Sequence, residues 1–309
     1  MTSRLLRPLA ACVTVALAAG VAAHAEDSVV GSLPRVFQLY QRKVDALAGN
    51  VAPRIFTGSA SIAPNFTLPP MVSIGVRGVR PHLGHFCGGT VVGAHWVLTA
   101  AHCTGVADWA SGKAVIAPLD PGRLQLLTGT NVLYAGGKVR AVERIVTHPD
   151  LRLAAPGVPE NDVALLQVAD AFEERPVPIA SDAQAMALLR PGEKIAILGW
   201  GTSSFVADAT ISSTLLFAFA DVVDRADCSK TYGGLVSEKM FCAGTGAADA
   251  CQGDSGGPSL SMVDGNPVLL GITSWGSGCT RRSYPGVYVN LVKYRGWVDG
   301  VIGTRKNAQ

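Results

Sequence analysis

Short hydrophobic runs recur along the chain, separated by segments that are rich in Gly, Pro and Asp. Strands of this length with turn residues between them are typical of antiparallel sheets. The pattern therefore predicts an all-β protein. We expect strands at residues 72–76, 90–92, 96–99, 124–127, 163–168, 195–198, 268–272 and 287–289.

The last part of the chain has a different hydrophobic period. Its apolar residues are spaced at i, i+3, i+4, i+7 and i+8, which places them on one face of a helix. They are Tyr294, Trp297, Val298, Val301 and Ile302. We expect a C-terminal helix at about residues 292–303, and a weaker stripe within residues 26–54 indicates a short helix there.

The N-terminus has the pattern of a secretory signal peptide. Arg4 and Arg7 precede an apolar run at residues 9–23, which closes on the small-x-small sequence Ala23-His24-Ala25. The alternative is a membrane anchor, but the run is shorter than the roughly 20 apolar residues that span a bilayer. We therefore expect residues 1–25 to be removed and the protein to be exported, to the extracellular space or to the periplasm of a Gram-negative bacterium.

The composition indicates a large core and excludes few partners by itself. Of the 309 residues, 48% are hydrophobic and 16% are charged, and the net charge is +3. No dense cluster of Lys and Arg marks a surface for nucleic acid or for a membrane. We expect neither partner, and we expect a monomer.

The cysteines are consistent with export. Cys12 lies in the signal peptide, and the other six are Cys87, Cys103, Cys228, Cys242, Cys251 and Cys279. An even number in an oxidising compartment suggests three disulfides, but six cysteines allow 15 connectivities and spacing alone cannot choose among them. Neither Cys-x-x-Cys nor paired-histidine spacing supports the alternative of a zinc site, so we expect no metal and no cofactor.

Three segments carry the elements of nucleophilic catalysis. Ser255 lies in GDSGGP, His102 in TAAHC, and Asp162 in NDVALL. A serine hydroxyl needs an imidazole to take its proton and an acid to hold that imidazole. Asp150 and Asp170 are nearby alternatives for the acid, and the residues alone leave this choice open. Together the segments resemble the trypsin/chymotrypsin family of serine proteases, and this resemblance favours Asp162, which the apolar residues 163–166 follow.

This resemblance implies two six-stranded antiparallel β-barrels followed by the C-terminal helix. On this basis the protease domain covers residues 55–303, with one barrel at about 55–180, the second at about 181–290, and a tail at 304–309. The crossover between the barrels is expected near residues 178–185. His102 and Asp162 would come from the first barrel and Ser255 from the second, so that the cleft lies between them.

The resemblance also implies the role of each catalytic group. His102 would act first as base and then as acid, Asp162 would fix its tautomer, and the backbone N–H groups of Gly253 and Ser255 would form an oxyanion hole. The disulfides implied by the family are Cys87–Cys103, Cys228–Cys242 and Cys251–Cys279.

Residues 26–54 are expected to be a propeptide. They end at Arg54, and cleavage there would make Ile55 the new N-terminus, although Phe56-Thr57 departs from the commoner Val-Gly. By resemblance, the freed ammonium of Ile55 pairs with the Asp254 carboxylate. The sequence therefore predicts a zymogen.

The expected specificity is trypsin-like. Asp249, six residues before Ser255, matches the acid at the base of the family's primary pocket. Gly276 and Gly286 match wall positions that keep this pocket open, and Ser274, Trp275 and Ala250 complete it. A carboxylate in an open pocket selects Arg or Lys, and Ala250 in place of a commoner serine favours Arg. The expected partners are polypeptides with Arg or Lys at the cleavage site, and protein inhibitors.

Other features depart from the family or point to rivals. Residues 126–142, the calcium loop of many trypsins, contain no Asp or Glu, with Thr130 where a carboxylate is usual, so we expect no calcium there. Segments 104–123 and 151–160 are longer than in a minimal trypsin and are expected to rim the cleft near His102. The rival functions are a catalytically silent binding protein with this fold and a serine esterase, but Ser255 lacks the Gly-x-Ser-x-Gly elbow of α/β-hydrolases.

Overall fold

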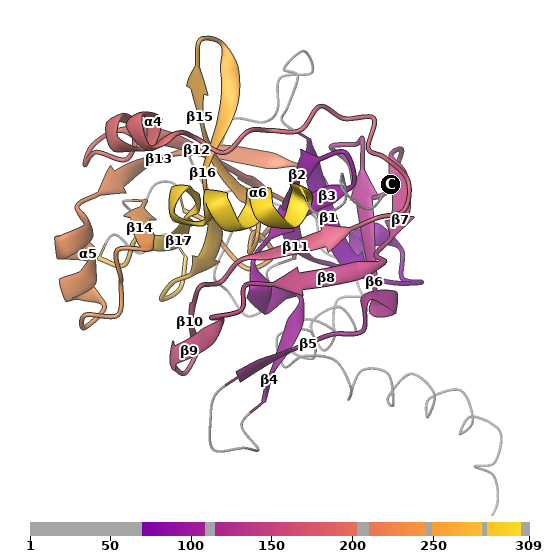
Figure 1. Ribbon diagram of the computed structural model, residues 1–309, viewed down its shortest axis with the longest axis horizontal. Helices are drawn as coiled ribbons and strands as arrows, with labels where there is room; N and C mark the ends of the chain where they lie inside the picture. Colours follow the sequence, from indigo (N-terminus) through magenta and orange to yellow (C-terminus); the bar gives the residue numbers. More distant parts are fainter. Residues whose placement is uncertain (1–69, 109–114, 203–209, 245–248, 280–282, 304–309) are drawn as a thin grey trace, which may run out of the picture.

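A computed structural model of the chain describes residues 70–108, 115–202, 210–244, 249–279 and 283–303 (Figure 1). The predicted signal peptide, propeptide and 304–309 tail lie outside the described residues, and so do Arg54 and Ile55. The described part consists mainly of two antiparallel β-sheet systems, one formed by each half of the chain.

The first half forms a seven-stranded sheet in the order β7-β6-β1-β2-β3-β11-β8. Its edge strands β7 and β8 are consecutive in the chain, with only Val142 and Glu143 between them. Val142 is buried and the Glu143 N–H bonds to Gln167 O in β11, so the chain itself joins the two edges of the sheet. Counted as one bent strand, β7 and β8 give the expected number of six. The strands are β1 (Met71–Val76), β2 (His85–Gly93), β3 (Trp96–Thr99), β6 (Leu124–Thr128), β7 (Lys138–Ala141), β8 (Arg144–Thr147) and β11 (Ala164–Gln167).

The second half forms a closed six-stranded barrel in the order β12-β13-β14-β17-β16-β15. The inward side chains of these strands are almost fully buried, as at Ile195, Leu270 and Tyr288. The strands are β12 (Lys194–Gly199), β13 (Leu216–Val223), β14 (Met240–Ala243), β15 (Pro258–Val263), β16 (Asn266–Trp275) and β17 (Gly286–Asn290).

The segment between the two halves contains a short helix, α4 (Asp182–Leu188). Ser181 begins it with a capping box, in which its side chain accepts from Gln184 N and Gln184 Oε1 accepts from Ser181 N. Just before the helix, the Ala180 N–H bonds to Leu269 O in the second barrel. The predicted crossover at 178–185 falls within this segment.

The two segments that the sequence marks as long both contain β-hairpins. The first pairs β4 (Gly105–Asp108) with β5 (Val115–Pro118), and the second pairs β9 (Arg152–Ala155) with β10 (Val158–Glu160). Both hairpins project on the same side of the first sheet in Figure 1. The remaining short helices are α3 (Pro81–Gly84), α5 (Arg225–Thr231), η1 (Ala101–Cys103) and η2 (Pro121–Arg123).

The chain ends in a helical segment, η3 (Leu291–Tyr294) followed by α6 (Arg295–Gly303). Tyr294 and Val298 are buried in the same core cluster as Leu98 and Leu165 of the first sheet, so α6 packs back across the first half (Figure 1). The predicted all-β fold with a C-terminal helix is confirmed. Within the described parts of the chain, no helix has the length and hydrophobicity needed to cross a bilayer.

Candidate active site

His102 lies on the short turn η1, directly after β3. The two residues before it, Ala100 and Ala101, are fully buried, and Thr99 Oγ1 donates to Gly88 O at 2.8 Å. The next residue, Cys103, forms a disulfide with Cys87 of β2. The imidazole is therefore held on a turn that is fixed on both sides.

Asp162 lies just before β11 and faces His102. Only 1% of its surface is exposed. Its Oδ1 accepts from the His102 backbone N–H at 2.8 Å, and its Oδ2 accepts from His102 Nδ1 at 2.7 Å and from Ser274 Oγ at 2.5 Å. Because Nδ1 donates to the carboxylate, neutral His102 carries its proton on Nδ1, and Nε2 is left as the base.

The charges of this pair stabilise each other. Burial alone would raise the pKa of Asp162, but the charge of His102 and the hydrogen bonds from His102 and Ser274 outweigh it, so the pKa lies below its ordinary value. Burial alone would lower the pKa of His102, but the Asp162 carboxylate outweighs it, so that pKa is raised. At neutral pH Asp162 is therefore ionised and can stabilise an imidazolium.

Ser255 is held by backbone hydrogen bonds to both halves of the molecule. Its carbonyl accepts from Gly88 N at 2.8 Å in the first sheet, and the N–H of the next residue, Gly256, bonds to Thr273 O at 2.8 Å in the second barrel. Gly256 has a φ of 75°, and a Cβ there would collide with Thr99 Oγ1, so only glycine fits after Ser255. His102 and Ser255 line the same cavity.

The backbone around Ser255 leaves two donors available. The N–H groups of Asp254, Gly256 and Gly257 make backbone hydrogen bonds, whereas those of Gly253 and Ser255 make none to the described residues. Gly253 has a φ of 96°. These two N–H groups are the ones that the sequence assigns to the oxyanion hole.

His85, at the start of β2, contacts this segment and was missed by the sequence analysis. It is fully buried, and burial lowers its pKa to about 4. Its Nε2 lies 3.1 Å from Gly253 O and its Nδ1 lies 2.7 Å from Ser73 Oγ. Since Gly253 O can only accept, neutral His85 donates from Nε2 and accepts from the Ser73 hydroxyl. Nothing in the sequence distinguishes His85 from the other histidines.

Asp254 is not among the residues that line the cavity, and its carboxyl is held by backbone N–H groups. Its Oδ1 accepts from Gly201 N at 2.7 Å and its Oδ2 from Cys251 N at 2.9 Å. A Cβ at Gly199 or Gly201 would collide with the carboxyl, so both glycines are needed for this packing. Burial raises the pKa of Asp254 to about 6, and among the described residues no cation forms an ion pair with it.

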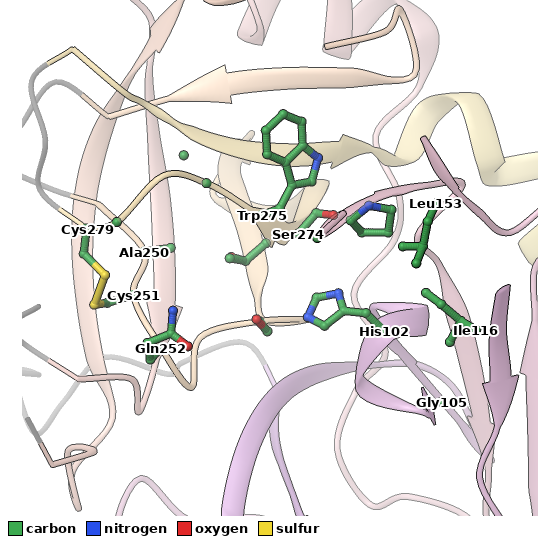
Figure 2. Close-up of a pocket in the computed structure, with 17 residues that line it drawn as sticks. His102, Gly105, Ile116, Leu153, Ala250, Cys251, Gln252, Ser274, Trp275 and Cys279 are labelled. Atoms are coloured by element: carbon green, nitrogen blue, oxygen red, sulfur yellow. A yellow bond between two sulfur atoms is a disulfide. The ribbon is translucent and has the colours of Figure 1, made fainter. Parts of the chain in front are cut away.

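Five of the residues expected in the primary pocket line a cavity with a volume of about 350 Å³ (Figure 2). Ala250, Ser274, Trp275, Gly276 and Gly286 line it. Asp249 is not among the residues that line the cavity, but its carboxyl lies close to Gly286, since a Cβ on Gly286 would be 2.8 Å from Asp249 Oδ1. A Cβ at Gly276 would meet nothing closer than 3.8 Å, so the absence of side chains here is what leaves the space open.

The three disulfides have the pairing that the resemblance implies, Cys87–Cys103, Cys228–Cys242 and Cys251–Cys279. The third lies at the rim of the cavity, close to Gln252 (Figure 2). Within the described residues, Cys87, His102 and Cys103 are near enough to one another to suggest a metal site. Both sulfurs are joined in a disulfide, however, so they cannot act as thiolate ligands.

The comparison with known proteins identifies the family. The family model described as Trypsin matches residues 55–298, which is most of the chain. The chain belongs to the trypsin family. Its relatives include Trypsin Blo t 3 of Blomia tropicalis, which is 35% identical over 228 residues that cover 70% of this chain and 77% of the relative. Trypsin alpha of Drosophila melanogaster is 32% identical over 252 residues, or 79% of this chain and 86% of the relative.

Membership in the trypsin family confirms the resemblance drawn from the GDSGGP and TAAHC segments. The protein is a trypsin-like serine endopeptidase that acts on polypeptide substrates.

Proposed function

We propose that this protein is an exported endopeptidase that cleaves after Arg, and less efficiently after Lys, and that it is made as a zymogen. The observation that carries the proposal is the Asp249 carboxylate beside Gly286, a residue that lines the same cavity as His102 and Ser255. A carboxylate there favours a cationic side chain, and the reacting groups lie in the same cavity.

In the proposed mechanism, His102 Nε2 takes the proton of Ser255 Oγ as this oxygen attacks the substrate carbonyl carbon. The Gly253 and Ser255 N–H groups stabilise the negative charge that develops on the carbonyl oxygen. His102 then gives its proton to the leaving amine as the C–N bond breaks, which leaves an acyl-enzyme on Ser255. Water then attacks the acyl carbon as His102 takes its proton. The bond to Ser255 Oγ breaks, the acid leaves, and His102 returns the proton to Ser255 Oγ.

The primary pocket supports the preference for Arg. A guanidinium can engage a carboxylate through two parallel hydrogen bonds, whereas an ammonium is a point charge that needs further oxygen acceptors around it. Ala250 lines the cavity and supplies no side-chain hydroxyl for that purpose. Arg should therefore be cleaved faster than Lys.

The surroundings of Asp254 support zymogen activation. Its carboxyl is held by two backbone N–H groups, its pKa is raised to about 6 by burial, and it has no ion-pair partner among the described residues. An α-amino group has an ordinary pKa near 8, so the N-terminus freed by cleavage after Arg54 would be a cation at neutral pH. This ammonium would form an ion pair with the Asp254 carboxylate. We propose that this ion pair fixes the Gly253–Ser255 backbone in its active form.

Export rests on the N-terminal sequence and on the disulfides. The charged, apolar and small-residue regions within residues 1–25 follow the order of a signal peptide. All six cysteines that follow it are paired, as expected of a protein that folds in an oxidising compartment.

The experiment that tests the specificity compares matched peptidyl-Arg, peptidyl-Lys and peptidyl-Phe amides on protein that has been cut after Arg54. We expect turnover of Arg above Lys and almost none of Phe. Asp249→Ser should lower kcat/KM for the Arg amide by about a hundredfold or more, because a buried cation would lose its partner, and Ser255→Ala is the inactive control. Equal turnover of Arg and Phe, or equal efficiency on Arg and Lys, would contradict the proposed preference.

The zymogen is tested with Arg54→Gln protein, which cannot be cut at this site by an Arg-specific protease. The uncut variant should hydrolyse the Arg amide far more slowly than processed wild type. Equal activity of the two would overturn zymogen activation, and silence of the correctly folded, processed protein on every amide would favour a binding scaffold.

A further inference from the structure

The loop at residues 130–137, between β6 and β7, is fixed from within by one hydroxyl, and we call it the Thr130 loop. Thr130 Oγ1 donates to Ala135 O at 2.9 Å and accepts from Val132 N at 3.0 Å, so it joins the two sides of the loop. Gly137 has a φ of 73°, and a Cβ there would lie 2.7 Å from Thr130 Cγ2. This glycine therefore allows the loop to close on the threonine side chain.

The Thr130 loop lies against the second half of the molecule. Asn131 O accepts from Leu215 N at 2.7 Å and from Trp200 Nε1 at 3.1 Å. Leu133 N donates to Ser213 O at 2.8 Å, and the Leu133 side chain is buried in the same core cluster as Trp200. The loop therefore holds both the backbone just before β13 and the indole of Trp200.

The residue after Trp200 packs against the backbone that carries the proposed oxyanion hole. Gly201 N donates to Asp254 Oδ1 at 2.7 Å, and a Cβ on Gly253 would lie 3.1 Å from Gly201 Cα, so these backbones are in close contact. Trp200 also contacts the ring of His85, whose Nε2 lies 3.1 Å from Gly253 O. Trp200 thus lies between the Thr130 loop and the contacts that hold Gly253.

We infer that Thr130 is a positioning residue for the oxyanion hole. Its hydroxyl fixes the Thr130 loop, the loop holds Trp200, and the backbone after Trp200 supports Asp254 and Gly253. The shape of the loop then depends on this hydroxyl and not on a hard cation, because residues 126–142 contain no Asp or Glu to bind one. This inference rests on the proposed function, in which the Gly253 N–H stabilises the oxyanion.

The first test compares Thr130→Val with wild type, both processed, on one Arg amide. Valine has a similar shape but can neither donate nor accept, so the loop loses both hydrogen bonds of the hydroxyl. We expect kcat to fall by about fivefold and KM to stay within about twofold, because the oxyanion hole acts in the transition state. A rise in KM at constant kcat would overturn the inference.

Two further variants control for the loss of a methyl and of a hydroxyl. Thr130→Ser keeps the oxygen and should retain most of the wild-type kcat. Thr231→Val removes a hydrogen bond from a threonine hydroxyl to Asp227 O on α5, and should leave kcat unchanged. Active-site titration counts the functional enzyme in each preparation, so an unfolded fraction does not lower kcat. Equal losses in Thr130→Ser and Thr130→Val would contradict a role for the hydroxyl.

The second test needs no catalysis, so it separates this inference from the proposed function. Hydrogen exchange is measured on uncut Ser255→Ala protein with and without Thr130→Val. We expect exchange to be about fivefold faster at the Leu215 and Gly201 amides as well as within the Thr130 loop. Faster exchange confined to the loop would overturn the inference even in an active Arg-specific protease. Coupled exchange in a protein that turns over no Arg amide would overturn the proposed function, and the positioning role with it.

A double-mutant cycle tests the route through Trp200. Trp200→Phe keeps an aromatic ring in the core but removes the N–H that donates to Asn131 O. It should lower kcat in the same direction as Thr130→Val, and the double variant should be little slower than the slower single variant, because both changes break one chain of contacts. Losses that multiply would show that Thr130 acts independently of Trp200, and would overturn this route.

A last measurement tests whether a cation fixes the loop. The kcat and thermal midpoint of wild type are compared in EDTA and in calcium at about 5 mM, which is above the range of extracellular calcium sites. We expect no difference between them, and no recovery of Thr130→Val by calcium. A higher kcat of wild type in calcium would show that a bound cation fixes the loop, and would overturn the assignment to Thr130.

Discussion

Lys239 Nζ donates a hydrogen bond of 2.8 Å to Asn161 Oδ1, and so connects the residue before β14 to the residue before Asp162. The same oxygen accepts from Tyr294 OH at 3.1 Å, and Asn161 Nδ2 donates to Asp150 O at 2.8 Å. Asn161 is buried and has a φ of 56°, a backbone conformation that Asn adopts more readily than most residues. These contacts tie the position of the Asp162 backbone to both halves of the molecule.

Asn161→Gly is expected to lower kcat by about tenfold and to leave KM within about twofold of wild type. Glycine retains the positive φ but loses every side-chain hydrogen bond, so the change isolates the positioning of Asp162 from backbone strain. Steady-state kinetics on an Arg amide measure kcat and KM separately. Lys239→Met should have a smaller effect in the same direction, and the exposed Lys293→Met is the matched control. A rise in KM at constant kcat would show that Asn161 serves substrate binding instead.

Ser274→Ala is expected to move the acid limb of the kcat/KM profile to higher pH. Ser274 Oγ lies 2.5 Å from Asp162 Oδ2 and contributes to the lowered pKa of that carboxyl. Without this donor the carboxylate becomes more basic and holds the His102 imidazolium proton more firmly, so His102 becomes neutral, and active as a base, only at higher pH.

The profile is measured with one Arg amide between about pH 5 and 9, a range that covers the titration of His102. Ser274→Thr keeps a hydroxyl and should restore the wild-type limb. An acid limb that stays in place in Ser274→Ala would show that the hydroxyl has only a structural role.

The strands that the sequence predicts are those with continuous apolar runs. β3 is buried along its whole length, and β16 along most of it, and both were expected. β7 is exposed at all of its positions except the buried Arg140, and β9 alternates exposed and half-buried positions, so neither strand has an apolar run to detect. The β9–β10 hairpin, like the β4–β5 hairpin, was therefore expected only as a long segment at the rim of the cleft.

The residues of the candidate active site also divide into those that the sequence predicts and those that it does not. Ser255 and His102 stand in short segments whose local sequence is unusual because the backbone there needs particular residues, as Gly256 does against Thr99. His85 and Asn161 act through partners 168 and 78 positions away, at Gly253 and Lys239. No local pattern reports such contacts, so they emerge only when the chain is folded.

His85→Gln is expected to remove a part of the protein's acid sensitivity. The pKa of His85 is lowered from 6.5 to about 4, so its contribution to stability is complete above about pH 6.5 and is lost as the pH falls through 4. A pKa shift of this size corresponds to a change in the free energy of unfolding of at most about 3 kcal/mol. Glutamine can still donate to Gly253 O but does not titrate.

Chemical denaturation at about pH 7 and about pH 4.5, on either side of the titration of an unfolded histidine, measures the effect. Wild type should lose more stability than His85→Gln between the two values. An equal loss in both proteins would mean that His85 is protonated in the fold at the lower pH, contrary to its burial.

Cleavage after Arg54 is expected to stabilise the protein at neutral pH much more than in acid. The pKa of Asp254 is raised from 3.8 to about 6, so in uncut protein its contribution to stability is complete below about pH 3.8 and is lost as the pH rises through 6. The ion pair with the Ile55 ammonium would recover this loss, which is at most about 3 kcal/mol.

Cut and uncut wild type are compared by thermal unfolding at about pH 7.5 and about pH 4.5, above and below the raised pKa. Asp254→Asn is the control, because an amide has no charge to compensate, and in this variant cleavage should have the same effect at both values. If the gain from cleavage in wild type were as large at the lower pH as at the higher, Asp254 would not be the partner of the new N-terminus.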